Sequence, residues 1–364
     1  MVSVIDMKSG FWQVEMHPDD KEKTAFCTTG GLWQYNVMPF GLGNVPATFE
    51  RLMENVLRDI IGKICMVYMD DVIVFSKTPA EHIEHLRIVF QKLQGAGLKL
   101  SLKKCSLFKK EVRYLGHIVS ASGLKTDPKK IETITKWPTP KDHTEIKSFL
   151  SLCSYYRRFV KDFANIVKPL NRLTEKEHPF DWTDNCQVAF DELKKKLCSS
   201  PVLAYPDPTK RFILDTDCSN VAMGAVLSQE HESGERVIAY FSKTLSRTEQ
   251  NYCVPRNELL AVVKSMKNFH KYLYGQKFLL RTDHAALQWI MNFKEPEGQM
   301  ARWLQYLQTY NFEIVHRKGK SHQNADSLSR RPCPEDCSHC GRQERKEVAI
   351  KAIQLNSNKH STTG

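Results

Sequence analysis

The chain lacks the features that direct a protein to a membrane or out of the cell. None of its apolar runs approaches the roughly 20 residues needed to cross a bilayer, and we find no signal peptide. Its eleven cysteines are odd in number and mostly isolated, which is not the pattern of a disulfide framework. We therefore expect reduced thiols in an intracellular protein, cytoplasmic or nuclear, that is neither secreted nor bound to a membrane.

Acidic residues are also scarce. The chain has 41 Asp and Glu against 53 Lys and Arg, a formal charge of +12. This balance favours a polyanionic partner such as nucleic acid, although many soluble proteins are basic. We find no internal repeat or low-complexity tract. A length of 364 residues is enough for two or three domains with their own cores.

The most informative stretch is Tyr68-Met69-Asp70-Asp71. Apolar segments at 64–67 and 72–75 flank it, which predicts a buried hairpin with the carboxylates near its turn. Adjacent ionised aspartates between hydrophobic strands repel each other and lose hydration. A hard cation such as Mg²⁺ offsets this repulsion, because it binds carboxylate and phosphate oxygens. The plainer alternative is a solvated Asp-Asp turn.

A second carboxylate makes the metal hypothesis stronger. Asp6 follows a short apolar strand and precedes a Ser-Gly break. Asp6 and Asp70 on neighbouring strands could hold two ions about 3.5–4 Å apart, as in in-line nucleotidyl transfer. Between them, a Gly- and Pro-rich loop at 38–46 leads into a helix that we expect over residues 46–60.

These three stretches, in this order, resemble motifs A, B and C of the reverse transcriptases of gypsy-type LTR retrotransposons. The similarity covers roughly residues 1–331 and continues through five further stretches, at 97–100, 103–105, 114–117, 155–159 and 324–330. Each motif alone is only suggestive, whereas the ordered set is very specific. The chain begins at the strand of Asp6, so we expect an N-terminally truncated Pol fragment without the fingers subdomain.

The resemblance implies a fold class and four segments. An α+β polymerase palm and a helical thumb/connection are expected first, followed by an α/β RNase H-like domain with a mixed sheet. The expected bounds are 1–126 for the palm, 127–204 for the thumb/connection, 205–331 for the RNase H-like domain, and 332–364 for a Cys-containing, disordered tail.

The resemblance also assigns roles in the palm. Asp6 and Asp70 become the main metal ligands with Asp71 in support, for two Mg²⁺ or Mn²⁺ ions per active site. Phe11 stands where the family's aromatic residue excludes a ribose 2′-OH. The other implied substrate contacts are Phe40 and Gly41 in the nucleotide pocket, Tyr68 and Met69 beside the acids, and Leu115 and Gly116 in the turn that grips the primer. Lys104 matches a lysine thought to protonate the leaving pyrophosphate. The alternatives are a solvated cation for Lys104 and a turn packed under the helix for Phe40.

The segment 155–161 mixes aromatic residues with cations, including Arg157 and Arg158. Such a surface can stack on bases and neutralise phosphates. An amphipathic bundle with solvated cations is the competing interpretation.

From Arg211 on, the pattern predicts three strands, a helix, a strand, helices and a last strand, the element order of an RNase H fold. Four acids stand at element ends, namely Asp217, Glu258, Asp283 and Asp326. Together they suit a two-metal hydrolytic site, although a lone acid at a helix start is usually a dipole partner. By resemblance they form the RNase H tetrad, with His316 as the loop histidine and His322 as its rival. Asp215 lies on the same strand face as Asp217, and the resemblance favours Asp217.

The tail contains Cys333, Cys337 and Cys340, with His339 beside the last of them. Three thiols are one ligand short of a tetrahedral zinc site, and an unstructured linker towards an integrase is the alternative.

The leading hypothesis is therefore an RNA-directed DNA polymerase fragment with ribonuclease H activity. Its expected partners are an RNA template, a DNA primer, an RNA–DNA hybrid and dNTPs, with protease and integrase segments in an intact element. A retroelement particle is a further expected location. The alternatives are a decayed or domesticated remnant that binds nucleic acid without polymerase catalysis, and a plain phosphodiesterase, which leaves residues 68–71 unexplained. We expect this chain alone to cleave hybrids but to extend primers poorly.

Overall fold

The computed structural model describes residues 1–175, 179–232, 234–282 and 298–316. These residues fall into two compact units, Met1–Lys130 and a second unit that begins at Ile131. Among the described residues, no helix combines the length and apolarity that a membrane crossing requires. The eight cysteines in these ranges are all free thiols.

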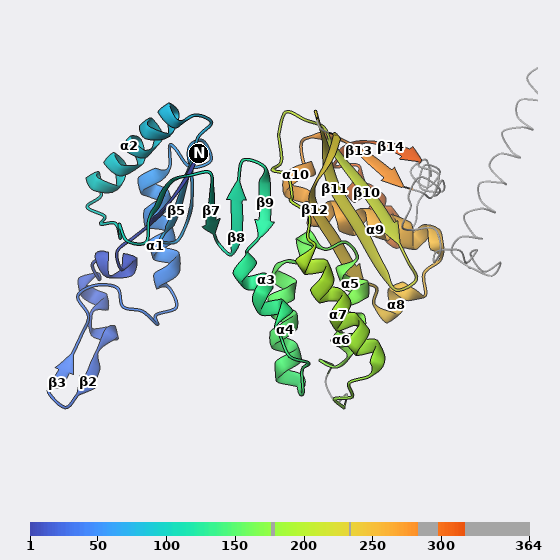
Figure 1. Cartoon of the computed structure of the whole chain (residues 1–364), viewed down its shortest axis with the longest axis horizontal. Coiled ribbons are helices and arrows are strands. Elements are labelled where there is room, and N and C mark those ends of the chain that lie inside the picture. The colour runs from blue at the N-terminus through green and yellow to red at the C-terminus, as the bar shows by residue number, and fades with distance from the viewer. Residues whose placement is uncertain (176–178, 233, 283–297, 317–364) are drawn as a thin grey trace, which may run out of the picture. The chain divides into compact units, whose positions relative to one another are not determined.

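The first unit is an α+β structure (Figure 1). Its strands are β1 (Val2–Asp6), β2 (Phe26–Thr28), β3 (Gly31–Trp33), β4 (Cys65–Tyr68), β5 (Asp71–Phe75), β6 (Ser106–Lys109), β7 (Glu111–Tyr114), β8 (His117–Ser120) and β9 (Gly123–Thr126). Its helices are the 3₁₀ turns η1 (Gly10–Gln13), η2 (Pro18–Asp20) and η3 (Glu22–Thr24), with α1 (Val45–Leu57) and α2 (Pro79–Gly95). Helix α3 (Pro128–Thr135) begins in this unit and ends in the next.

The central sheet has the strand order β4-β5-β1-β6 and is covered on both faces. On one face, Ile5, Val72 and Val74 share a core with side chains of α1 and α2. On the other, Val4 and Ile73 pack against Val112 of the separate β7-β8-β9 sheet. Double coverage explains why β5 is apolar at successive positions instead of alternating.

One expectation for this unit was wrong, and two elements were missed. We expected strands around Lys99, Val112 and Ile118, but Lys99 lies in an irregular segment, where only Leu100 forms a bridge, with Met7. The β2–β3 hairpin and strand β9 were not predicted. The hairpin has no apolar alternation to reveal it, since all six of its residues are exposed, and β9 is a four-residue strand with one buried position.

A buried histidine fastens α2 to the central sheet. His82 Nε2 lies 2.7 Å from Ser3 Oγ of β1, and His82 Nδ1 lies 2.9 Å from Ser76 Oγ. Burial lowers the pKa of His82, so the folded state favours the neutral ring. The unfolded chain then takes up a proton more readily as the pH falls through about 6.5, and the free energy of unfolding decreases.

We therefore expect the melting temperature of the chain to drop between pH 7.5 and 5.5. His82→Gln keeps an amide donor and acceptor but cannot titrate, so its melting temperature should vary less over this range. Thermal unfolding of both proteins at five pH values tests this, and equal slopes would contradict the role given to His82.

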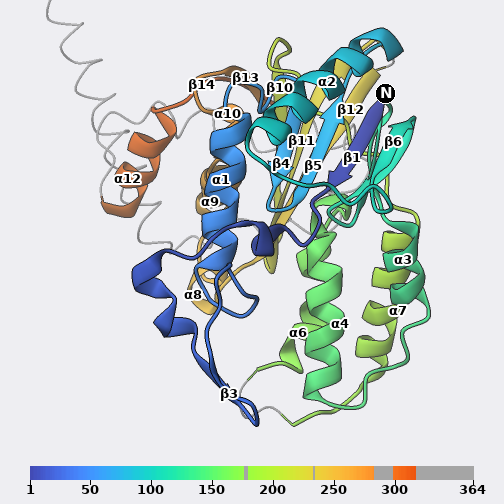
Figure 2. The same ribbon diagram turned by 90° about the vertical axis from the view of Figure 1, so that its left-hand side faces the viewer.

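The second unit starts with helices. They are α4 (His143–Tyr155), η4 (Arg157–Phe159), α5 (Phe163–Ile166), α6 (Lys168–Arg172) and α7 (Asp184–Cys198). Helices α3, α4 and α7 run alongside one another (Figure 2). Phe149 of α4 packs on Phe190 of α7 with ring centroids 4.6 Å apart, and Lys194 of α7 donates to the carbonyl of Trp137.

A five-stranded mixed sheet follows, with the order β12-β11-β10-β13-β14. Its elements are β10 (Phe212–Cys218), β11 (Ala222–His231), β12 (Gly234–Thr244), α8 (Arg247–Gln250), α9 (Val254–Asn268), α10 (His270–Leu273), β13 (Lys277–Thr282), α12 (Gly298–Leu307) and β14 (Asn311–His316). Strands β10, β11 and β12 are antiparallel, whereas β13 is parallel to both β10 and β14. Helix α9 packs against β10 and β11 (Figure 1). This is the element order that the sequence predicts.

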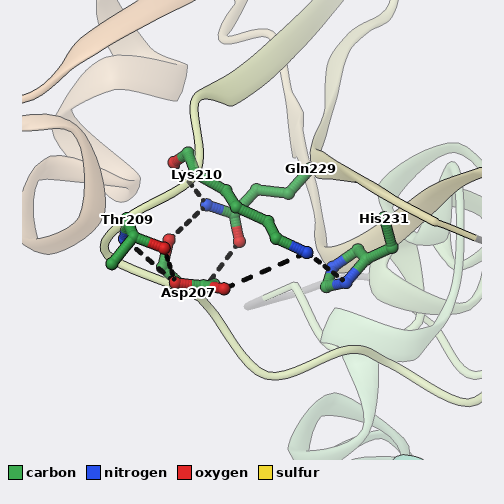
Figure 3. A network of polar contacts seen from close by, with 5 residues as sticks. All are labelled: Asp207, Thr209, Lys210, Gln229 and His231. Atoms are coloured by element: carbon green, nitrogen blue, oxygen red, sulfur yellow. Dashed lines mark hydrogen bonds and ion pairs between the residues drawn. The ribbon is translucent and has the colours of Figure 1, made fainter.

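Residues 207–210, which lead into this sheet, are fixed by polar contacts (Figure 3). The buried Gln229 amide donates to the carbonyls of Asp207 and Lys210, each at 2.8 Å, and accepts from the Asp207 amide at 2.9 Å. Thr209 closes a turn on the Asp207 carboxylate, and Lys210 Nζ lies 3.4 Å from His231 Nδ1. Position 207 is thereby held beside β11.

Candidate active sites

The β4–β5 hairpin presents the Asp pair as predicted from its flanking strands. Tyr68 pairs with Asp71, so Met69 and Asp70 form a two-residue turn. Met69 has a φ of 54°, and its amide donates to the Glu50 carboxylate of α1. This bond ties the turn to the helix that follows the Gly/Pro-rich loop.

Strand β1 brings the third acid to the same place. Asp6 and Asp71 are register partners in the antiparallel β1–β5 pair, and the Met7 amide donates to the Asp70 carbonyl at 3.3 Å. Directly opposed residues have Cβ atoms about 4.5–5.5 Å apart, so two ionised carboxylates here repel each other. Burial raises the pKa of Asp71, and Asp70 and Asp6 raise it further.

One cation faces this cluster. Lys104 Nζ lies 3.4 Å from Asp6 Oδ1, an oxygen that is buried and has no hydrogen-bond partner among the described residues. The Lys104 segment is held near β1 because the Ser101 amide donates to the Asp6 carbonyl at 2.9 Å. Lys104 therefore lies at the acid cluster, and its predicted role as a general acid stays a prediction.

The acids fit a divalent metal ion in charge and in ligand type. All three donors are carboxylates, the ligands that Mg²⁺ prefers, and a buried Asp6 oxygen lacks a hydrogen-bond donor. Within the described ranges, no three His, Cys, Asp or Glu side chains form a ready-made metal cage. A bound ion would have to draw these carboxylates together.

Aromatic rings line the space beside the acids. Phe11 packs against Phe40 and Phe49 with centroid distances of 5.3 and 5.5 Å. Phe40 is 64% exposed, although Phe49 beneath it is buried. Gly41 has a φ of +96°, which only glycine adopts readily. Phe11 and Phe40 thus form one wall, at the position predicted for the nucleotide.

Gly10 is required by close packing at this wall. A Cβ atom there would lie 2.9 Å from the Phe49 ring and 3.4 Å from Asp70 Cβ. We expect Gly10→Ala to cost about 1–3 kcal/mol through overpacking and to reduce primer extension by displacing the ring or the Asp70 turn. Extension assays with thermal unfolding test this. Gly95→Ala is the matched control, because its Cβ meets nothing within 4 Å, and an equal loss in both variants would contradict the packing argument.

Gln13 supports the site and was missed in the sequence. Its Nε2 donates to the carbonyls of Lys8 and Lys99 at 2.7 and 3.0 Å, and its Oε1 accepts from the Lys99 amide at 2.6 Å. These bonds clamp the segment before Lys104 onto the loop after Asp6. No sequence signal could have found Gln13, because its partners are main-chain groups, which every residue type provides.

The predicted primer-gripping residues form the tight turn between β7 and β8. Leu115 and Gly116 have φ values of 45° and 67°, the pattern of a type I′ hairpin turn. Just before it, the Tyr114 hydroxyl donates to the Asp71 carbonyl at 3.3 Å. The turn is therefore connected to the acid cluster through one side chain.

In the second unit, Asp217 and Glu258 come from different elements, β10 and α9. Asp217 is the penultimate residue of β10, and Glu258 is buried on α9 at 2% exposure. Both contribute, after burial, to raising the pKa of the Cys218 thiol, so both lie near that thiol. His316 ends β14 opposite Thr282 of β13. Asp283, Asp326 and His322 lie outside the described residues, as do Cys333, Cys337, Cys340 and His339 of the tail.

Arg157 and Arg158 have partners that the sequence did not reveal. Arg157 Nη2 donates to the Ser242 carbonyl at 2.5 Å, and Arg158 Nη2 to the Ile238 carbonyl at 3.5 Å. Both carbonyls belong to β12. The two guanidinium groups thus bind η4 to the sheet, and their predicted phosphate contacts stay a prediction.

Comparison with known proteins gives two family matches. Residues 1–119 match the reverse transcriptase (RNA-dependent DNA polymerase) family, and residues 207–310 match the RNase H-like domain found in reverse transcriptase. The second match begins at Asp207, the residue that the Gln229 side chain of β11 holds in place.

Similar proteins agree with these matches. The Pol polyprotein from transposon 297 of Drosophila melanogaster is 44% identical over 330 residues, 90% of this chain and 31% of that protein. The polyprotein from transposon gypsy of the same organism is 38% identical, over 90% of this chain and 33% of that protein. A solved foamy viral protease–reverse transcriptase in complex with an RNA/DNA hybrid has a TM-score of 0.77 at 25% identity, over 91% of this chain and 45% of that chain.

The chain spans about a third of the length of the curated relatives it matches. The palm expected at the start of the chain and the mixed-sheet RNase H-like fold expected after it are confirmed. Residues 1–119 therefore belong to the reverse transcriptase family and residues 207–310 to the RNase H-like domain family found in reverse transcriptases, and the chain as a whole is similar to the matching part of retrotransposon Pol polyproteins.

Proposed function

We propose that this chain carries two activities, RNA-directed DNA synthesis in the first unit and hydrolysis of RNA in RNA–DNA hybrids in the second. The observation that carries the proposal is the register of β1 and β5, which sets Asp6 opposite Asp71 and beside Asp70. Three carboxylates on adjoining strand ends have no structural purpose of their own, because their mutual repulsion destabilises the fold.

In the first unit, divalent ions would supply charge compensation for the triphosphate and activation of the primer 3′-OH. The residues to hold them are Asp6 and Asp70, with Asp71 in support. Phe11 restricts the space next to a sugar 2′ position, and Phe40 and Gly41 shape the base pocket. Lys104, already at the acid cluster, can return a proton to the departing pyrophosphate.

In the second unit, Asp217 and Glu258 would hold ions that activate water, together with Asp283 and Asp326. Magnesium or manganese suits this set, since all four ligands are carboxylates. The foamy viral relative was solved with an RNA/DNA hybrid and with double-stranded DNA. We propose the same nucleic-acid classes as partners here, with dNTPs as substrates and protease and integrase segments as neighbours in a longer polyprotein.

Two incubations test the proposal. The chain is given a primed RNA template with dNTPs, with and without an added fingers segment from a close relative. Separately it is given an RNA–DNA hybrid labelled on the RNA strand, and each reaction is run with Mg²⁺, with Mn²⁺ or with a chelator. Metal-dependent extension and cleavage support it. Hybrid binding without either reaction would favour a non-catalytic remnant, and cleavage of plain single-stranded RNA at the same rate would favour a general phosphodiesterase.

A further inference from the structure

A short main-chain ladder pairs the end of β1, and the two residues after it, with the loop that follows α2. At one end of the ladder, the Ser101 amide donates to the Asp6 carbonyl at 2.9 Å. At the other end, the Lys8 amide donates to the Lys99 carbonyl, also at 2.9 Å, and a β-bridge lies between these two bonds. A pairing of this length opens readily at any end that nothing closes.

The Gln13 side chain closes the ladder at the end away from Asp6. Its Nε2 donates to the carbonyls of Lys8 and Lys99 at 2.7 and 3.0 Å, and its Oε1 accepts from the Lys99 amide at 2.6 Å. The carboxamide thus takes the place of one more main-chain peptide group, because it combines a donor and an acceptor in one planar unit. A carboxylate of the same shape only accepts hydrogen bonds, and it would face two carbonyl oxygens.

The ladder determines where the Lys104 side chain lies. The Ser101 carbonyl accepts from the amides of Lys104 and Cys105 at 2.9 and 3.1 Å, so a tight turn begins where the ladder ends. At this turn, Lys104 Nζ lies 3.4 Å from Asp6 Oδ1. The lysine side chain is 67% exposed, and an ion pair that water screens holds a chain segment only weakly. We therefore attribute the position of Lys104 to the ladder and not to the ion pair.

The nucleotide wall is held by different contacts. Phe11 belongs to the same 3₁₀ turn as Gln13, but its ring packs on Phe40 and on the buried Phe49 at centroid distances of 5.3 and 5.5 Å. These ring contacts do not use the Gln13 amide. A change at Gln13 should therefore displace Lys104 and leave the wall in place.

We propose that Gln13 is a positioning residue of the polymerase site, which holds Lys104 beside the acids by closing the ladder after β1. The inference rests on the proposed polymerase activity. Loss of the Gln13 amide should lower kcat for nucleotide addition, because the cation at the acid cluster is displaced. The KM for dNTP should be kept, because Phe11 and Phe40 stay where they are.

Gln13→Glu in the full chain is the first test, because it keeps the size of the side chain and removes its donor. Primer extension is measured with an added fingers segment from a close relative. We expect kcat to fall roughly tenfold, less than the 10²- to 10⁴-fold that a general acid can contribute, with the KM for dNTP changed by less than about twofold. In a chain that carries Lys104→Met, the same substitution should cost little more, since residues that act through one interaction are not additive.

Amide hydrogen exchange in residues 98–105 gives a second measurement, which does not depend on activity. The ladder and its turn protect the amides of Lys99, Ser101 and Lys104. Gln13→Glu should speed their exchange by about tenfold through local opening, whereas Lys104→Met should not, since the ion pair does not hold the segment. Gln91→Glu is the matched control, because Gln91 lies exposed on α2, and it should change neither exchange nor kcat.

Four results would overturn the inference. Unchanged exchange in residues 98–105 would show that Gln13 does not hold the segment, and faster exchange throughout the first unit would make it a general stabilising residue. Equal acceleration by Lys104→Met would assign the position to the ion pair. A full further loss of kcat when Gln13→Glu is added to Lys104→Met would show that Gln13 acts by another route.

The test remains decisive if a variant or an activity fails. If Gln13→Glu does not fold, Gln13→Met removes the same hydrogen bonds without adding a charge, and the same measurements are applied to it. If the unmodified chain extends no primer even with the fingers segment, the proposed function fails. The exchange rates then decide alone whether Gln13 holds the segment of Lys104.

Discussion

Asp217→Asn is expected to remove cleavage of RNA–DNA hybrids while leaving hybrid binding and primer extension in place. The substitution nearly preserves shape but removes the charge that holds the ion. Metal activation contributes several kcal/mol to such reactions, so the rate should fall by about 10²- to 10³-fold. Cleavage is measured on labelled RNA, and binding on the same hybrid without metal.

Asp215→Asn is the informative comparison for this result. Its amide can still accept from Arg281 of β13, which binds the Asp215 carboxylate, so the strand pair keeps part of its connection, and cleavage should fall far less than in Asp217→Asn. If Asp217→Asn cut at the original rate while Asp215→Asn was inactive, the assignment of the β10 ligand would be wrong.

Asp70→Asn should give the reciprocal result. Primer extension should fall by at least about 10²-fold, because positioning and charge compensation supply most of the catalysis in phosphoryl transfer. Hybrid cleavage should not change, since Asp70 belongs to the first unit. Extension is measured on a primed RNA template, with an added fingers segment from a close relative if the chain alone extends poorly.

The control for this variant is Asp59→Asn. Asp59 is an exposed acid that pairs with Lys92 away from the turn, so its loss should leave extension intact. Equal defects in Asp70→Asn and Asp59→Asn would point to general destabilisation. Strong extension by Asp70→Asn would remove this residue from the polymerase site.

The elements that could be predicted are those whose buried side chains form a periodic apolar pattern in the sequence. Helix α1 was expected because apolar residues recur on one face, and Phe49, Met53 and Leu57 are indeed buried there. A strand was also expected at Lys277–Thr282, where a short apolar run ends at polar residues, and β13 has these bounds. The acids were predictable because carboxylates beside buried strands are costly and stand out.

Contacts between residues far apart in the chain could not be predicted, because they leave no periodic pattern in the sequence. Gln13 reaches the Lys99 main chain across 86 positions, and Arg157 reaches β12 across 85. Neither contact constrains the type of its partner residue. Arg281 follows the short apolar run of β13, but only the strand register shows that it meets Asp215 of β10.

The packing of both faces of β5 has a consequence for the aggregation of this chain. The run Val72-Ile73-Val74-Phe75 is strongly β-prone and uncharged, the kind of segment that forms intermolecular sheets when it is exposed. It is shielded by α1 and α2 on one side and by β7 on the other, and β7 follows it by more than thirty positions. During synthesis, the hairpin that carries Asp70 and Asp71 therefore emerges before its second cover exists. Substitutions that loosen β7 should send the protein into aggregates while every catalytic carboxylate is still present.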